Sequence, residues 1–176
     1  MTLWVFGYGS LMWNPGFDYE EQFIARLPGY HRSFCMRSIH HRGTDENPGL
    51  VLALDETDEA QCAGIALSVP TGQEADVLGY LRERELISSA YLEKQLKVHL
   101  SDGRIVAAVT YVVDPHHVQY CGGIALEDQA QIIAQAVGGR GPNTEYLFNT
   151  TAHLKELGIE DVELDWLVNR VRNILG

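Results

Sequence analysis

The sequence predicts an α+β fold, a curled or barrel-like mixed β-sheet with helices packed on it, in a single compact domain of residues 1–176. Segments with the composition of strands fill the first two thirds of the chain, whereas helical spacing of apolar residues dominates the last third. The 176 residues are 45% hydrophobic, so they can bury one sizeable core. The sequence contains no internal repeat, low-complexity tract or linker that would divide it.

Several segments have the composition of strands. The first is the apolar run that ends at Phe6, and the others are residues 19–25, 29–36, 50–54, 62–69, 91–100 and 105–113. Turns are expected at Pro28-Gly29 and at Asp102-Gly103. Residues 55–59 are strongly acidic, and we expect them to form a solvated hairpin tip.

Helical segments are predicted after the fifth strand segment and in the last third of the chain. The first begins at a capping box in residues 71–74, packs Val77, Leu78 and Leu81 against a core, and carries Glu85 at its end. The remaining helices are residues 126–137, residues 143–157 with Asn143 as the cap, and residues 161–175 with Leu164, Leu167, Val168 and Val171 on one face.

Composition excludes several classes of function. The net charge of −11 argues against binding to nucleic acid and to an anionic membrane surface, since both favour basic proteins. No run of 18 apolar residues and no basic leader region occurs. Cys35, Cys62 and Cys121 are odd in number and widely spaced, so no disulfide framework is expected. We therefore expect a cytoplasmic protein with neither nucleic-acid nor membrane partners, and the sequence leaves its oligomeric state open.

The loop after the first strand is the most informative stretch of the chain. Gly7 and Gly9 follow the strand, and Pro15-Gly16 stops regular structure soon afterwards. Glycines at a strand end expose backbone N–H groups in a concavity that suits an anion or a polarised carbonyl. A strand end that needs glycine for a turn explains the same residues.

Three better-known loop motifs do not fit this stretch. A dinucleotide fingerprint needs a third glycine where Met12 stands, followed by a helix that Pro15-Gly16 prevents. A phosphate-binding loop needs a lysine, and the first lysine of the chain is Lys94. A nucleophile elbow around Ser10 needs glycine at Tyr8. The sequence therefore predicts no nucleotide cofactor.

Taken in order, five sequence blocks resemble the ChaC-like, glutathione-specific γ-glutamylcyclotransferases. They are VFGYGSLMWNP at residues 5–15, HRGT at 41–44 followed by PG at 48–49, YLxxRE at 80–85 with residues 82 and 83 unspecified, YVVD at 111–114 and NTEYL at 143–147. Their common order and spacing carry the resemblance over nearly the whole chain. It implies the compact cyclotransferase fold and glutathione as a small-molecule substrate.

The chemistry of such an enzyme needs few protein groups. A γ-glutamyl amide is cleaved when its own α-amino nitrogen attacks the γ-carbonyl carbon, which releases 5-oxoproline and a free amine. The enzyme must supply a base, donors for the oxyanion, and a fold that bends the substrate into attack geometry. Because the nucleophile belongs to the substrate, no serine, cysteine or metal need take part.

The resemblance places the general base at Glu85. A carboxyl group at the end of an apolar helix face can be partly buried, which raises its pKa towards neutrality. Glu83 is the rival two residues away, but it points to a different helix face and only Glu85 falls at the family's catalytic position. A helix-end glutamate paired with a neighbouring arginine is the structural alternative.

The resemblance also implies a set of substrate-binding residues. These are Gly7, Tyr8, Gly9, Ser10, Leu11 and Met12 through their backbone N–H groups, Arg42 through its charge, and Tyr111 and Tyr146 through their hydroxyls. Arg42 belongs to an interval, residues 22–44, without any acidic side chain, where Arg26, Arg32 and Arg37 also lie. The alternatives are arginines that only cover a sheet and tyrosines that only fill a core.

One departure from the family pattern concerns the loop after Glu85. The family often carries glycine there, whereas this chain has LISSAY at residues 86–91. Because that loop is expected to lie over the cysteinylglycine part of glutathione, the change bears on substrate preference more than on reaction type. Two other classes stay open: a cyclotransferase for other γ-glutamyl amines or amino acids, and a non-catalytic binding or regulatory protein.

Histidine and cysteine pairs raise the question of a metal. His31 with Cys35, and His117 with Cys121, are four residues apart. This spacing brings ligands together on a helix, but both segments are predicted to be strand or loop. We therefore predict no metal site.

Overall fold

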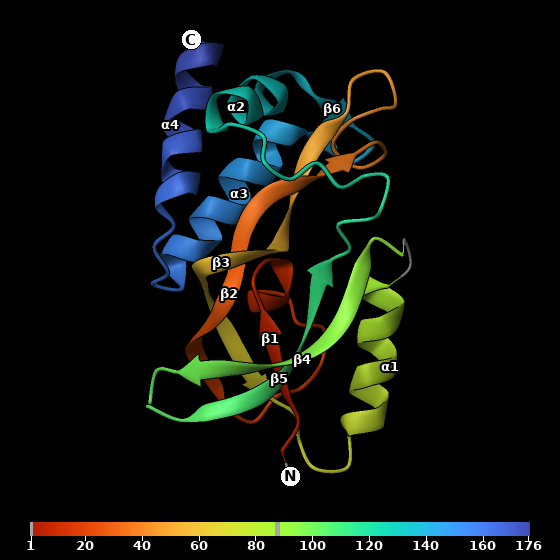
Figure 1. Cartoon of the computed structure of the whole chain (residues 1–176), viewed down its shortest axis with the longest axis vertical. Coiled ribbons are helices and arrows are strands. Elements are labelled where there is room, and N and C mark those ends of the chain that lie inside the picture. The colour runs from red at the N-terminus through yellow and green to blue at the C-terminus, as the bar shows by residue number, and fades with distance from the viewer. Residues whose placement is uncertain (1, 87–88) are drawn as a thin grey trace. The chain divides into compact units, whose positions relative to one another are not determined.

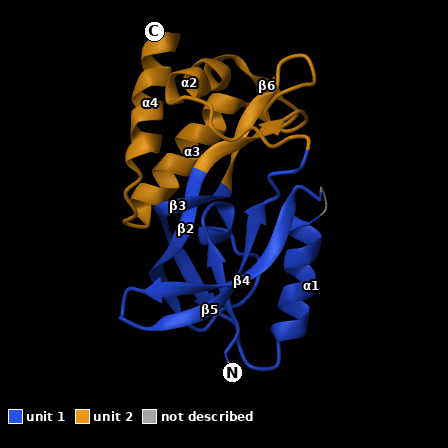
Figure 2. Ribbon diagram, in the orientation of Figure 1, with its two compact units in different colours: residues 1–32, 54–117 blue, residues 33–53, 118–176 orange. Residues whose placement is uncertain are grey.

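The computed structural model describes residues 2–86 and 89–176 (Figure 1). They form two compact units, each built from two segments of the chain (Figure 2). Unit 1 comprises residues 1–32 and 54–117, and unit 2 comprises residues 33–53 and 118–176. The two longest strands, β2 (Gln22–Ser38) and β3 (Gly49–Ser68), contribute residues to both units.

Five strands close into a barrel in the order β1-β3-β2-β4-β5. The shorter strands are β1 (Trp4–Gly7), β4 (Tyr91–Leu100) and β5 (Ile105–Val113). Strand β1 pairs antiparallel with β3 and parallel with β5, so the sheet is mixed. With the helices described below, this arrangement confirms the predicted α+β class and its barrel-like sheet.

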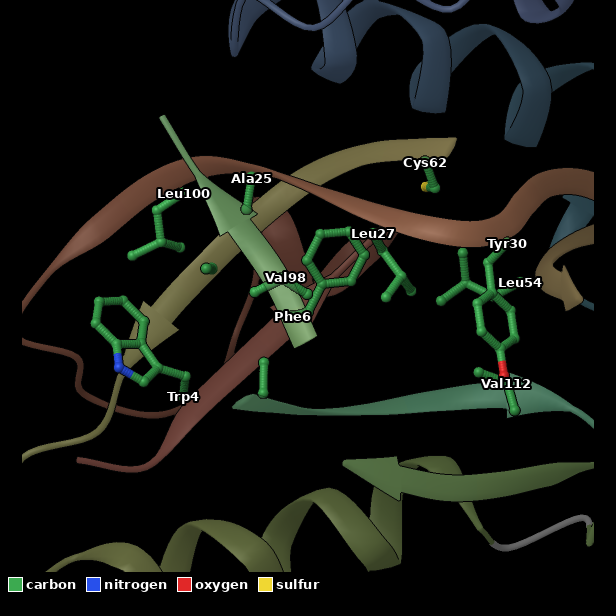
Figure 3. Close-up of a cluster of buried hydrophobic side chains, with 12 residues drawn as sticks. Trp4, Phe6, Ala25, Leu27, Tyr30, Leu54, Cys62, Val98, Leu100 and Val112 are labelled. Atoms are coloured by element: carbon green, nitrogen blue, oxygen red, sulfur yellow. The ribbon is translucent and has the colours of Figure 1, made fainter. Parts of the chain in front are cut away.

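Strand β1 is buried on both faces because its alternate side chains enter two clusters. Trp4 and Phe6 belong to a cluster to which all five strands contribute (Figure 3). Val5 points the other way and packs with Val77 and Leu81 of helix α1 (Glu74–Glu85). The short apolar run at the start of the chain therefore ties the barrel to the helix that carries the candidate base.

Helix α1 begins two residues after the start that the predicted capping box implies, and it is capped in a different way. Gln73 is the N-cap residue, and no side chain caps the helix there. Instead, the Glu74 carboxylate accepts from the Gly72 N–H at 2.9 Å and 3.2 Å. Gly72 has a φ of +94°, and this turn brings its N–H to Glu74 in place of the Thr71 contact expected of a capping box.

Two predicted interruptions of the sheet are absent from the long strands. Strand β2 continues through Pro28-Gly29, where the positive φ of Gly29 (+84°) is accommodated within the strand. Strand β3 continues through residues 55–59, so the expected hairpin tip is wrong, although most of these acidic residues are exposed as expected. Pairing along the barrel outweighs the local turn preference at both places.

Strands β4 and β5 confirm their predicted bounds. The turn between them lies at Asp102-Gly103, where Gly103 has a φ of +97°. The Asp102 carboxylate accepts from the Arg104 N–H at 3.0 Å, which fixes the turn.

Unit 2 contains three helices that pack on one another and a two-stranded hairpin. The elements are α2 (Leu126–Gln135), β6 (Val137–Gly138), β7 (Gly141–Pro142), α3 (Asn143–Glu156) and α4 (Val162–Leu175). Helix α4 buries the four apolar residues that were predicted, and Asp161 caps it by accepting from the Leu164 N–H at 3.1 Å. Asn143 is not a cap. Its buried side chain accepts from Leu50 N–H at 2.8 Å and donates to Leu50 C=O at 2.9 Å, so it joins α3 to β3.

No helix in the described part of the chain has both the length and the apolar character needed to cross a membrane.

Candidate active site

The glycine-rich loop leaves β1 at Gly7 and enters a single 3-10 turn at Ser10–Met12. The Met12 N–H donates to the Gly9 carbonyl at 2.9 Å, so the loop itself uses one of the donors predicted for the substrate. The side chains of Leu11 and Met12 are buried and anchor the loop in the protein. The binding role of the loop N–H groups stays a prediction, and a substrate contact from Met12 N–H would compete with its bond to Gly9.

The two glycines of the loop differ in what requires them. A Cβ on Gly7 would lie 2.9 Å from the Cβ of Leu11, so packing demands glycine there. Gly9 has a φ of −137°, and apart from Gly9 and its two chain neighbours no described residue has an atom within 4 Å of the position a Cβ would take. The fold of the described residues therefore leaves open space beside Gly9, on a loop predicted to bind substrate.

Arg32 supports the loop from inside unit 1. Its side chain is buried, its Nε donates to the Tyr8 carbonyl at 3.0 Å, and its Nη2 donates to the Ala63 carbonyl. Sequence reasoning placed Arg32 in a positive interval but did not assign it to the loop. Its acceptors lie 24 and 31 residues away along the chain, so no local pattern indicates them.

Arg84 supports the same loop from helix α1. Its Nη2 donates to the Ser10 hydroxyl at 2.9 Å, and its Nη1 donates to the carbonyls of Asn14 at 2.8 Å and Pro15 at 3.1 Å. Its Nε lies 3.5 Å from Oε1 of Glu85. One guanidinium group therefore contacts both the loop and the candidate base.

Glu85 is the last residue of helix α1, and its side chain is 20% exposed. Burial raises the pKa of this carboxyl, and the positive charge of Arg84 opposes the rise. Glu83 is exposed on another face of the helix. The predicted difference between the two glutamates in burial is confirmed, and so is the predicted direction of the Glu85 pKa.

Tyr111 is buried, and its hydroxyl donates to Oε1 of Glu93 at 2.8 Å. Glu93 also accepts from Nε and Nη2 of Arg82 at 2.9 Å and 3.0 Å. The hydrogen bond from Arg82 holds the pKa of Glu93 below its ordinary value, whereas burial raises the pKa of Tyr111. A hydroxyl predicted to donate to substrate thus already donates to a carboxylate.

The turn signal in the sequence does not settle this pairing. Glu93 and Tyr111 are register partners on β4 and β5, because Leu100 N–H donates to the Arg104 carbonyl at 2.8 Å and leaves a loop of residues 101–103. A two-residue loop at Asp102-Gly103 would have paired Glu93 with Val112 instead.

The other two predicted binding residues lie in unit 2 and contact each other. The Arg42 guanidinium lies 5.8 Å from the centroid of the Tyr146 ring, and its Nη1 donates to the Pro142 carbonyl at 3.1 Å. Glu145 lies 3.6 Å from the same nitrogen. The Tyr146 hydroxyl accepts from the Leu52 N–H at 3.1 Å. The structure therefore brings Gly7–Met12, Glu85 and Tyr111 into unit 1, and Arg42 and Tyr146 into unit 2.

The described residues contain no cluster of three or more His, Cys, Asp or Glu side chains able to hold a metal ion. The pairs His31 with Cys35 and His117 with Cys121 therefore gain no third ligand within that part of the chain. All three cysteines are buried thiols. Of the loop after Glu85, residues 87 and 88 lie outside the described residues, so the structure does not address the expectation attached to LISSAY.

The fold matches that of known γ-glutamyl cyclotransferases. The crystal structure of the yeast γ-glutamyl cyclotransferase specific to glutathione matches with a TM-score of 0.82 over 99% of both chains, at 24% sequence identity. YkqA from Bacillus subtilis matches with a TM-score of 0.61 over 97% of this chain and 54% of its own, at 21% identity. The fold class of this chain is therefore the one seen in the yeast enzyme and in YkqA.

Sequence comparison narrows this class to one family. The model of the ChaC-like protein family matches residues 3–174. The glutathione-specific γ-glutamylcyclotransferase of Escherichia coli K12 is 38% identical over 99% of this chain and 74% of its own length. The human glutathione-specific γ-glutamylcyclotransferase 1 is 33% identical over 99% of this chain and 80% of its own. This chain belongs to the ChaC-like family.

Proposed function

We propose that this protein is a glutathione-specific γ-glutamylcyclotransferase that converts glutathione into 5-oxoproline and cysteinylglycine. The observation that carries the proposal is the partly buried Glu85 carboxyl, with its raised pKa, next to the arginine that binds the glycine-rich loop. A base with a raised pKa can take a proton from an ammonium group and return it at neutral pH. The curated relatives at 33% and 38% identity carry the same activity in their names.

In the proposed reaction, Glu85 removes a proton from the α-ammonium group of the glutamyl moiety. The freed nitrogen attacks the γ-carbonyl carbon, and the new C–N bond closes a five-membered ring. The carbonyl oxygen becomes an oxyanion, which the N–H groups of residues 7–11 stabilise. As the bond to the cysteinyl nitrogen breaks, Glu85 returns the proton to that nitrogen. The ring nitrogen gives up its second proton, so the products are the neutral lactam and cysteinylglycine with a protonated amino group. The two products together contain all the atoms of glutathione, so neither water nor a cofactor is consumed.

The remaining binding roles are part of this proposal. Arg42 is proposed to attract a substrate carboxylate, and Tyr111 and Tyr146 are proposed to contribute hydroxyls. The resemblance to the family supports these roles. To bind substrate, the Tyr111 hydroxyl would have to replace its hydrogen bond to Glu93, and the Tyr146 hydroxyl would have to replace its hydrogen bond from Leu52. We further propose the cytoplasm as the location, because its reducing conditions keep thiols such as the three buried cysteines reduced.

The decisive experiment is incubation of the purified protein with reduced glutathione and no added cofactor. We expect equimolar 5-oxoproline and cysteinylglycine, measured by chromatography, and the same rate in the presence of EDTA. Turnover of γ-glutamyl-alanine without turnover of glutathione would place the protein in the neighbouring cyclotransferase class. Binding of glutathione without any product would favour the non-catalytic alternative. Activity that EDTA abolishes and zinc restores would refute the cofactor-free mechanism.

A further inference from the structure

Arg84 makes more contacts than an ion-pair partner of Glu85 needs. It donates to the Ser10 hydroxyl and to the carbonyls of Asn14 and Pro15, and its Nε lies 3.5 Å from Glu85. The loop contacts are 2.8–3.1 Å long, so each of them is a better hydrogen bond than the contact to Glu85. The geometry of the guanidinium is therefore set by the loop as much as by the carboxyl.

The contacts of Arg84 use the shape of the guanidinium group. Nη1 and Nη2 point to the loop, and Nε faces Glu85, so one planar group spans both. Nη1 of Arg84 also donates to the hydroxyl of Tyr80, one helical turn earlier, at 3.2 Å, so Tyr80 helps to hold the guanidinium group in place. A lysine has one compact ammonium group and cannot reach these acceptors in the same arrangement. The side chain is 20% exposed, so solvent weakens these bonds less than at a fully exposed site.

We propose that Arg84 is a positioning residue that holds the glycine-rich loop at the end of helix α1 and so fixes the loop N–H groups relative to the Glu85 carboxyl. This inference rests on the proposed function, in which those N–H groups stabilise the oxyanion and Glu85 moves the proton. Both groups must meet one substrate, and a misplacement of about 1 Å in such a site lowers the rate by about 10²-fold.

The charge of Arg84 has a second effect, which can be separated from its shape. Arg84, on the same helix, is the charged group that acts on the pKa of Glu85 among the described residues, and the charge of Glu85 in turn raises the pKa of Tyr111 on strand β5. The positive charge of Arg84 favours the ionised carboxylate, so its removal raises the pKa of Glu85 further. The acid limb of the rate profile, which requires ionised Glu85, then moves to higher pH. The change Arg84→Lys keeps the positive charge but loses the planar set of N–H donors that contacts the loop and Glu85 together.

The test compares Arg84→Lys and Arg84→Met with the parent protein in glutathione cleavage over a range of pH. We expect Arg84→Lys to lower kcat by about 10-fold to 10²-fold, with KM changed by less than about threefold and the acid limb in place. Arg84→Met should lower kcat at least as much and also move the acid limb to higher pH. The matched control is Arg104→Met, which removes an arginine that pairs with Asp102 at 2.8 Å in the β4–β5 turn. It should keep kcat within about twofold, as is usual for an exposed pair.

A measurement without substrate separates this inference from the proposed function. Hydrogen exchange of the peptide that covers residues 8–16 should be about tenfold faster or more in both Arg84 variants and unchanged in Arg104→Met, because the lost bonds open the loop locally. If the parent protein does not cleave glutathione, the proposed function fails and the exchange data still report on the loop. Full kcat in Arg84→Lys, or unchanged loop exchange in Arg84→Met, would overturn the positioning role.

Discussion

Two carboxyl groups of unit 1, one at the end of helix α1 and one on strand β4, respond to their surroundings in opposite directions. Glu85 and Glu93 are similarly exposed, at 20% and 25%, and each lies beside an arginine. The pKa of Glu85 is raised by burial, whereas that of Glu93 is lowered by the hydrogen bond from Arg82. Arg82 donates two hydrogen bonds to Glu93, and the Tyr111 hydroxyl donates a third. By contrast, the contact between Arg84 and Glu85 is 3.5 Å long.

The comparison shows that a neighbouring arginine does not by itself fix the state of a carboxyl group. Two things decide it: how strongly burial disfavours the charged form, which is the main cause at Glu85, and whether the arginine donates hydrogen bonds to the carboxylate, which is the main cause at Glu93. Arg84 directs its terminal nitrogens to the glycine-rich loop and leaves Glu85 to titrate. Environments that separate two pKa values in this way are typical of a catalytic group next to a structural one.

The largest expected change is in kcat, and it follows from removing the carboxyl group of Glu85. Glu85→Gln keeps the size of the side chain but cannot accept the ammonium proton, so kcat should fall by about 10²–10⁴-fold. Calorimetry should show that glutathione still binds, because the proposed binding contacts lie elsewhere. The control is Glu83→Gln, on the exposed face of the same helix, with kcat within a few-fold of the parent. A dead Glu83→Gln beside an active Glu85→Gln would reassign the base.

The next largest effect is a loss of folding stability when the carboxyl group of Glu93 is replaced. Glu93→Gln weakens the charge-assisted bonds from Arg82 and Tyr111, and we expect the free energy of unfolding to fall by about 1–3 kcal/mol. The rate should stay within about tenfold of the parent, because Glu93 acts by holding other side chains in place. Denaturant unfolding and glutathione turnover measure the two quantities. A rate loss as large as that of Glu85→Gln would show that Glu93 takes part in proton transfer.

The two glutamates should also give opposite trends of stability with pH. The pKa of Glu85 is raised above 4.5 by folding, so its charging opposes folding as the pH rises from 4.5 through the folded-state value. Glu85→Gln should therefore gain stability relative to the parent over that interval. The pKa of Glu93 is lowered below 4.5, so its contribution is present above pH 4.5 and is lost as the pH falls through the folded-state value. The deficit of Glu93→Gln should shrink over that lower interval. Parallel curves for the two variants would contradict the assignment.

The smallest effect is expected from Tyr111→Phe. The change removes the hydroxyl that donates to Glu93, one hydrogen bond worth about 0.5–1.5 kcal/mol of stability. The proposed substrate contact would replace the bond to Glu93, so kcat should fall by less than about fivefold, since one hydrogen bond of about 1 kcal/mol corresponds to a factor of that size. A loss of about 10²-fold at unchanged stability would show that the hydroxyl does more in the transition state than exchange one hydrogen bond.

Elements with strong local signals could be predicted from the sequence. The hairpin of β4 and β5 follows from the Asp102-Gly103 turn, and helix α4 follows from its apolar face and the Asp161 cap. The continuous strands β2 and β3 could not be predicted in the same way. Their turn-like residues are local preferences, and pairing with distant strands decides the outcome.

In the candidate site, too, features with a local signal could be predicted, whereas contacts between distant residues could not. Helical spacing predicts that Glu83 and Glu85 point to different faces, and the family resemblance then selects Glu85 as the candidate base. The contacts of Arg32 and Arg84 with the loop join residues 24 to 74 positions apart, so only the folded chain shows them. The requirement for glycine at position 7 likewise appears only in the folded chain, because it depends on the position of the Leu11 side chain.

The way in which the chain is shared between the two units constrains how such a protein can be recombined. The chain passes from unit 1 to unit 2 after residue 32, returns after residue 53, and leaves again after residue 117. No single genetic crossover can deliver one unit without part of the other. The first two passages also lie within β2 and β3, so a crossover there would join half-strands from two parents. We therefore propose that the two units are inherited together as one domain.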